Sequence, residues 1–169
     1  MIIRKLELQD ADYMLEWMHS NNVTEYLAQN FSVKTVEDCR NFIQSSLNDE
    51  DRNIHRAICS DTGEYLGTVS LKHIDTKNRN AEYAISMREK AMGTGASLYG
   101  TKEILKFAFQ NLGLHKVYLN VCTENKRAIK FYKKFGFVYE GLSKEHLLIK
   151  GKLRDLEWYA YYEDMGDEK

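Results

Sequence analysis

The stretch that decides the fold is residues 80–141, which read NAEYAISMREKAMGTGASLYGTKEILKFAFQNLGLHKVYLNVCTENKRAIKFYKKFGFVYEG. Ala81–Met87 alternates apolar and polar side chains as a half-buried strand does, with Glu82 facing away from its apolar neighbours. After a turn that contains glycine, Leu98–Leu112 carries apolar residues three or four apart, which predicts a helix. Lys116–Val121 is β-branched and aromatic and follows that helix. We therefore expect a second strand parallel to the first.

A short helix and a hairpin complete this half of the chain. Asn125 is a typical N-cap residue, and apolar side chains repeat at helical spacing from Ala128 to Phe135, before Gly136. Residues 137–148 and 152–162 then predict a long hairpin that turns at Lys150–Gly151.

The residues before this stretch predict a strand, two helices and an antiparallel meander. Ile2–Leu8 alternates as a strand, Asp10 is placed to cap a helix that ends near His19, and Thr35 with Asp38 forms a variant of the capping box. The meander strands are expected at residues 54–59, 65–74 and 81–87. The pattern indicates an α/β (α+β) fold with a mixed central sheet and flanking helices.

Length and composition limit the class of protein. The 169 residues, 43% of them apolar, suit a single domain spanning 1–169. With 24 basic and 25 acidic side chains, the sequence gives no reason to expect nucleic acid or an anionic membrane as a partner. Three cysteines without a CxxC spacing predict neither a disulfide framework nor a zinc or other metal site, which fits a cytoplasmic protein. No apolar run approaches the length of a membrane span.

The turn Met92–Ser97, MGTGAS, places two glycines where a strand gives way to a helix. Backbone N–H groups can converge there on an anion at the positive end of the helix, and glycine lets phosphate oxygens approach the backbone. A tight turn without a ligand is the alternative. The turn is not a Walker motif, since no GKS or GKT follows, and the meander before it does not suit a dinucleotide fingerprint.

The chain resembles the GNAT superfamily of acyl-CoA-dependent N-acyltransferases, whose pyrophosphate loop reads Arg or Gln, two residues, Gly, one residue, then Gly or Ala. Without gaps, Met92 stands at the Arg/Gln position, Gly95 at the first glycine and Ser97 at the second. A reading shifted to Lys90–Gly95 matches the letters better but requires a two-residue insertion in the helix. The segment ENKRAIKFYKKFGFVYEG and the ending KGKLRD are similar to the Rim-type subgroup, whose members include ribosomal-protein N-terminal, spermidine and amino-sugar acetyltransferases.

The resemblance implies the GNAT fold, in which an antiparallel meander leads to a parallel strand pair around the cofactor, and acetyl-CoA as co-substrate. It implies that pantetheine pairs with the backbone of Ile85 and Met87, and that Asn125 and Tyr132 contact the pantetheine and the thioester sulfur. The diphosphate would bind the loop residues Met92, Gly93, Thr94, Gly95, Ala96 and Ser97.

Three residues are candidates for the chemistry. Tyr132 can give a proton to the departing thiolate, although the same position suits a core aromatic. Glu82 is the first candidate for the base that makes the amine neutral, with a solvated strand glutamate as the alternative, and His73 is the second candidate. Trp17, Tyr26 and Phe31 are candidates for the acceptor pocket, with core packing favoured for Trp17.

The expected reaction is transfer of acetyl from acetyl-CoA to a primary amine by direct attack in a ternary complex. The amine could belong to a protein N-terminus, a polyamine or an amino sugar. A polyamine would need a local acidic pocket, for which Glu25, Asp38 and Glu50 are the candidates. Cys122 has no histidine motif beside it, so no acyl-cysteine is expected. A non-catalytic CoA-binding sensor or scaffold is the alternative function, and a homodimer is compatible with the resemblance.

Overall fold

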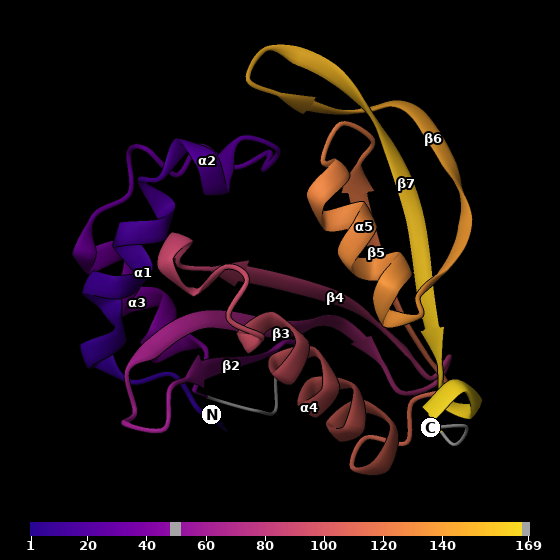
Figure 1. Ribbon diagram of the computed structural model, residues 1–169, viewed down its shortest axis with the longest axis horizontal. Helices are drawn as coiled ribbons and strands as arrows, with labels where there is room; N and C mark the ends of the chain where they lie inside the picture. Colours follow the sequence, from indigo (N-terminus) through magenta and orange to yellow (C-terminus); the bar gives the residue numbers. More distant parts are fainter. Residues whose placement is uncertain (48–51, 167–169) are drawn as a thin grey trace.

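The computed structural model describes residues 1–47 and 52–166, in which the strands form one mixed sheet of seven (Figure 1). The strand order is β1-β2-β3-β4-β5-β7-β6, with β4 and β5 parallel and the other neighbours antiparallel. The bounds are β1 Ile2–Arg4, β2 Ile54–Cys59, β3 Tyr65–Asp75, β4 Asn80–Met87, β5 Lys116–Cys122, β6 Val138–Ile149 and β7 Lys152–Tyr162. The expected meander, parallel pair and hairpin are confirmed.

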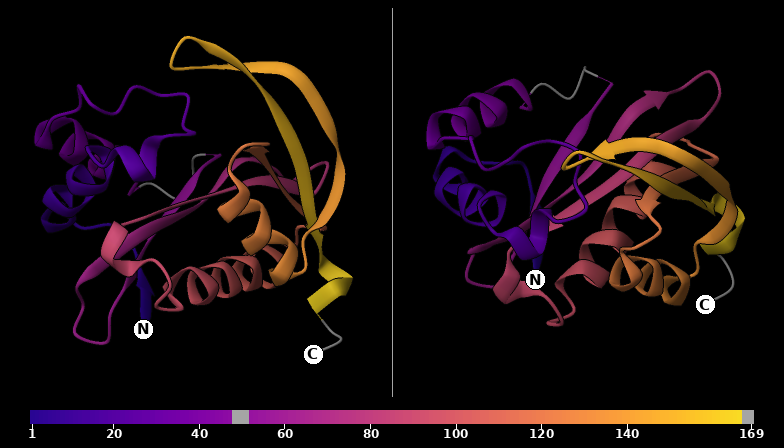
Figure 2. Two further views of the ribbon diagram at one scale, coloured as in Figure 1. Left: turned by 45° about the horizontal axis from the view of Figure 1, so that its top comes forward. Right: turned by 90° about the horizontal axis from the view of Figure 1, so that it is seen from above.

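Helices cover both faces of the sheet (Figure 2). On one face, α4 and α5 pack against β3, β4 and β5 in a large apolar cluster, and on the other α1 and α3 pack against β2 and β3. The helices are α1 Ala11–Met18, α2 Asn21–Thr24, α3 Val36–Ser45, α4 Ala96–Gln110 and α5 Lys126–Phe135, with 3-10 turns at Leu8–Asp10, Glu89–Ala91 and Glu163–Gly166. None of the described helices is long and apolar enough to cross a membrane.

The parallel strands β4 and β5 stay together only at their beginning. Pairing runs from Asn80–Lys116 to Glu82–Tyr118 and then stops, although β4 continues to Met87 and β5 to Cys122. On its other side β4 remains paired with β3 as far as Met87. Residues 83–87 of β4 therefore keep an edge that no neighbouring strand covers.

The β6–β7 hairpin is long and extends beyond the rest of the sheet (Figure 1). Pairing of β7 with β5 covers only residues 156–162 of β7, so the end of the hairpin lies past the β5 strand. Leu148 and Leu153 near its turn are more than half exposed.

Three local expectations differ from the structure. The first strand, expected over Ile2–Leu8, ends at Arg4, and Leu8–Asp10 forms a 3-10 turn. Asp10 precedes α1 but does not cap it, because its buried carboxylate accepts hydrogen bonds of 2.8 Å from both terminal nitrogens of Arg4. The helix α4 begins at Ala96 rather than Leu98, since Gly95 adopts a φ of 88° and takes the N-cap position. The capping box of Thr35 and Asp38 at α3 is confirmed.

Candidate active site

The split between β4 and β5 opens a cleft of about 460 Å³, called here the β4–β5 cleft. Its walls come from the second half of β4, the turn before α4, the end of β5 and the start of α5. The candidate residues that line it are Glu82, Ile85, Met87, Met92, Gly93, Ser97, Asn125 and Tyr132. Residues that sequence analysis drew from three separate segments thus share one cavity, whereas the predicted loop residues Thr94, Gly95 and Ala96 do not line it.

The turn before α4 presents backbone donors at one end of the cleft. Gly93 and Gly95 have φ values of 78° and 88°, a region open to glycine at little cost. In the described part of the chain, the N–H groups of Gly93, Gly95, Ser97 and Leu98 have no backbone acceptor, while Thr94 N–H bonds to Ala91 and Ala96 N–H is 3.4 Å from the Thr94 hydroxyl. Unpaired donors at a helix N-terminus favour an anion.

Arg127 adds a positive charge that the sequence analysis missed. It lines the cleft from the first turn of α5, and its Nη1 lies 3.0 Å from the sulfur of Met92. The sequence signal that could have identified Arg127 is its position two residues after the N-cap residue Asn125. The proximity to the turn depends on how α5 packs beside α4.

Asn125 both caps α5 and lines the cleft. Its side-chain oxygen accepts a hydrogen bond from the N–H of Ala128 at 3.2 Å. Within residues 1–47 and 52–166 its side-chain NH₂ group makes no hydrogen bond, so that group remains available as a donor.

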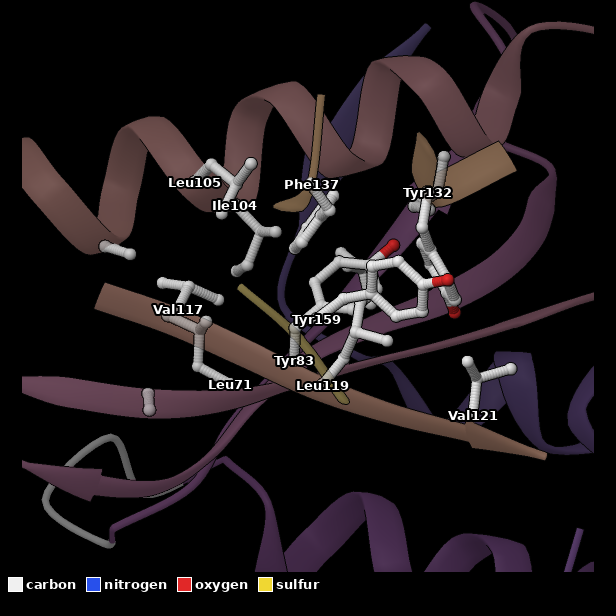
Figure 3. Close-up of a cluster of buried hydrophobic side chains, with 14 of the residues drawn as sticks. Leu71, Tyr83, Ile104, Leu105, Val117, Leu119, Val121, Tyr132, Phe137 and Tyr159 are labelled. Carbon is white, nitrogen blue, oxygen red and sulfur yellow. The ribbon is translucent and has the colours of Figure 1, made fainter. Parts of the chain in front are cut away.

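Tyr132 is buried on α5, in contact with Tyr83 of β4 and with Phe137 (Figure 3). Its hydroxyl makes none of the hydrogen bonds found among the described residues, whereas the Tyr83 hydroxyl lies 2.8 Å from that of Thr101. Burial alone raises the pKa of Tyr132 above its ordinary value, because the phenolate would lose its hydration. The side chain is a protonated phenol, and it lines the β4–β5 cleft.

Glu82 and Lys72 line the other end of the cleft, and His73 lies beside Glu82. The Glu82 carboxylate lies 2.9 Å from Lys72 Nζ and 3.7 Å from His73 Nε2. The side chain of His73 is 70% exposed and lines neither cavity described here, whereas Glu82 is largely covered and lines the cleft. The two candidate bases are therefore neighbours, and Glu82 is the one that faces the cleft.

A second cavity of about 260 Å³, called here the rear cavity, lies between α1, α3 and the opposite face of the sheet. It shares Lys72, Ala84, Ile85 and Ser86 with the cleft, so the two spaces meet along β4. Of the predicted acceptor-pocket residues, Trp17 and Phe31 line the rear cavity and Tyr26 lines the cleft. Sequence analysis missed its floor residues, which include His55, Thr68 and Ser70.

The family follows from the sequence match. The acetyltransferase (GNAT) domain family matches residues 1–138, most of the chain. The chain belongs to this GNAT family. The assignment confirms the expected fold, the acetyltransferase activity towards amines and acetyl-CoA as co-substrate.

Several GNAT relatives cover nearly the whole chain. The spermidine N(1)-acetyltransferase of Escherichia coli strain K12 is 30% identical over 157 residues, 90% of this chain and 81% of the relative. An uncharacterised N-acetyltransferase of Bacillus licheniformis is 29% identical over 163 residues, 94% of this chain and 90% of the relative. The Vibrio cholerae spermidine N-acetyltransferase, solved in complex with CoA and spermine, has a TM-score of 0.86 at 23% identity and covers 96% of this chain and 95% of its own. That structural likeness supports the GNAT fold.

The described residues provide no cluster of metal ligands at the GNAT site. Within the described ranges, no group of three or more His, Cys, Asp or Glu side chains is arranged to hold a metal ion. Of the acidic residues considered for a polyamine pocket, Asp38 lines the rear cavity, Glu25 is exposed and lines neither cavity, and Glu50 lies outside the described residues.

Proposed function

We propose that this GNAT enzyme acetylates a small primary amine, with the co-substrate in the β4–β5 cleft and the amine entering from the rear cavity. The amine nitrogen attacks the thioester carbonyl carbon, so that an N–C bond forms and the C–S bond breaks. One proton leaves the amine and one reaches the sulfur. The observation that carries the proposal is that the buried, unpartnered Tyr132 hydroxyl shares one cleft with Gly93 and Ser97, two residues whose N–H groups have no backbone acceptor.

The residues at the turn fit the diphosphate of acetyl-CoA. The free N–H groups of Gly93, Gly95 and Ser97 supply donors, the α4 N-terminus supplies a partial positive charge, and Arg127 supplies a full one. Because Met92 stands where the family usually has Arg or Gln, the loop lacks one side-chain hydrogen-bond donor. Because most of the donors are backbone groups, the loop keeps its binding capacity.

The edge of β4 suits the pantetheine arm. Residues 83–87 have no strand partner on the β5 side, so Ile85 and Met87 offer backbone groups there to an amide-bearing ligand. The free amide of Asn125 lies on the opposite wall of the cleft. When bound, acetyl-CoA supplies an activated acyl group, and these contacts would hold it along β4.

Tyr132 is proposed as the acid that protonates the leaving thiolate. Its raised pKa keeps the proton on the phenol until a strong base forms nearby. The free hydroxyl needs to break no hydrogen bond with the described residues in order to donate.

Glu82 is proposed as the base, acting directly or through water. Its side chain lines the β4–β5 cleft, and its carboxylate lies 2.9 Å from Nζ of Lys72, which lines both cavities. The Lys72 ammonium opposes a second positive charge close to it, which favours the neutral, reactive form of the acceptor amine. His73 touches the same carboxylate from outside and is the second candidate.

Spermidine is a second candidate acceptor, favoured by the activity named for the Escherichia coli and Vibrio cholerae relatives. The protein N-terminus and amino sugars remain further acceptors of the same reaction. We also propose a cytoplasmic location, supported by the free thiols of Cys39, Cys59 and Cys122.

The test combines calorimetric titration of acetyl-CoA with a thiol-release assay over a panel of primary amines. We expect binding of acetyl-CoA and amine-dependent release of CoA. Binding without turnover of any amine would contradict the proposed reaction and favour a CoA sensor.

A further inference from the structure

The walls of the rear cavity are apolar and mostly supplied by the two helices on that face. Met14, Trp17 and Met18 of α1 and Cys39 of α3 are buried there, and Phe31 and Phe42 are partly buried. The ring of Phe31 meets Trp17 edge to face at 5.3 Å. Such a surface gains free energy by covering apolar groups of a ligand rather than charged ones.

The floor is formed by side chains from three adjacent strands, and most of these side chains are polar. His55 of β2 lies opposite Ser70 of β3, which lies opposite Ala84 of β4. The hydroxyls of Ser70 and Thr68 already have partners, since Ser70 Oγ lies 2.7 Å from His55 Nδ1 and Thr68 Oγ1 lies 2.7 Å from the Tyr65 hydroxyl. Burial, with help from the charges of Lys72 and Arg56, lowers the pKa of His55 to about 4, so its ring is uncharged at neutral pH.

The charges at the rear cavity do not suit a polyamine. Its one lining carboxylate, among the described residues, is that of Asp38, which accepts hydrogen bonds of 2.8 Å from both the N–H and the hydroxyl of Thr35. Lys34 and Lys72 also line the cavity, and Lys72 is paired with Glu82. In the described part of the chain Lys34 makes no salt bridge within 4.0 Å, and its charge acts on the nearby carboxylate of Asp38, so its ammonium can also contact an anionic group of a ligand.

The size of the rear cavity and its position beside β4 further restrict the kind of ligand that it can bind. The volume of about 260 Å³ is below the roughly 300 Å³ at which pockets for drug-sized ligands begin, so one compact group fills it. The cavity opens to the β4–β5 cleft past Ala84 and Ser86, whose small side chains leave room for a reacting nitrogen. If the apolar group of a ligand fills the cavity, its reacting amine lies at β4 beside the opening. Such a ligand therefore carries the amine close to its apolar group.

We propose that the rear cavity binds the apolar side chain of an α-amino acid, whose α-amino group is acetylated at β4 and whose carboxylate meets Lys34. This inference rests on the proposed function and names the acceptor class. An apolar residue at the N-terminus of a peptide shares the side chain and the α-amino group but lacks the adjacent carboxylate.

The test compares kcat/KM for L-methionine, L-phenylalanine, methioninamide, a methionyl dipeptide, spermidine and glucosamine at saturating acetyl-CoA. We expect methionine or phenylalanine to exceed spermidine and glucosamine by at least about tenfold, the discrimination typical of a well-filled apolar pocket. Preference for the dipeptide over methionine would keep the apolar pocket but overturn the role of Lys34. Equal or better turnover of spermidine or glucosamine would overturn the inference and leave the acetyltransferase activity intact. Turnover of none of these amines would overturn both.

Two variants, Phe31→Ala and Lys34→Gln, test which residues of the rear cavity recognise the amino acid. Phe31→Ala should raise KM for the apolar amino acid about tenfold, as expected for losing a large apolar contact, with KM for acetyl-CoA unchanged. Val33→Ala is the matched control, because Val33 is 69% exposed two residues away and does not line the cavity. Equal KM values for Phe31→Ala and the native enzyme would contradict the assignment.

Lys34→Gln tests the carboxylate contact. It should lower kcat/KM for methionine and leave that for methioninamide unchanged, because the amide offers no charge to Lys34. Lys77→Gln serves as the control, since Lys77 is exposed in the turn before β4 and lines neither cavity. An equal loss on methionine and on its amide would overturn the contact.

Discussion

Replacing Tyr132 with phenylalanine removes one hydroxyl from the β4–β5 cleft and keeps the aromatic packing. The rings of Tyr83, Phe131 and Phe137 lie 6.0, 5.5 and 5.6 Å from that of Tyr132, and each contact survives the change. Among the described residues the hydroxyl has no hydrogen-bond partner to lose. The free energy of unfolding should therefore change by less than about 1 kcal/mol.

The loss of activity should be much larger. A positioned acid contributes about 10²–10⁴-fold to the rate, equivalent to about 3–5 kcal/mol of transition-state stabilisation. Burial raises the pKa of Tyr132, so the phenol keeps its proton throughout the range below about pH 10. The native enzyme should accordingly show no loss of activity from Tyr132 ionisation below that pH, and the defect of the variant should be similar at about pH 6 and about pH 9.

The assay is thiol release at saturating acetyl-CoA, with calorimetric titration for affinity and denaturant unfolding for stability. Tyr161→Phe is the control, because Tyr161 packs against Phe137 while its hydroxyl donates to the carbonyl of Met165 at 3.2 Å, outside the cleft. It should cost about 1 kcal/mol of stability and leave kcat unchanged. If kcat of Tyr132→Phe stays within about twofold of the native value, far from the expected range, the acid role is wrong.

Three further changes test other parts of the site. Glu82→Gln should lower kcat/KM most at low pH, where more of the amine is protonated, and a pH–rate profile parallel to the native one would remove Glu82 as the base. Gly95→Ala should lower the free energy of unfolding by about 1–2 kcal/mol, because Gly95 has a φ of 88°, and should weaken acetyl-CoA binding in a titration. An equal weakening of acetyl-CoA binding by Gly141→Ala, where a Cβ meets nothing within 4 Å, would contradict the loop assignment. Unfolding free energy should fall as the pH drops from 6.5 to about 4, because unfolded His55 binds a proton that the folded state resists. His55→Gln should flatten that slope, and an unchanged slope would exclude this source.

Local sequence patterns were sufficient for most of the architecture. The alternation in Ala81–Met87, the helical spacing before Gly113 and the capping side chain of Asn125 act over a few neighbouring residues, so the parallel pair and its flanking helices could be predicted. Asp10 shows where such patterns fail. Its carboxylate accepts hydrogen bonds from Arg4, and this partner comes close only when the chain folds back on itself.

The sequence by itself determined the family, the order of the strands' pairing partners in the meander and several of the residues that line the β4–β5 cleft, because periodicity and short motifs carry that information. Only the tertiary structure decided that Arg127 lies beside the turn, that Lys72 holds Glu82, and that a cavity remains behind β4. The alternation of Thr68, Ser70 and Lys72 predicts a shared face, but not what covers it. A cavity is the space that distant helices leave unfilled, so it depends on packing between elements rather than on the preferences of any one of them.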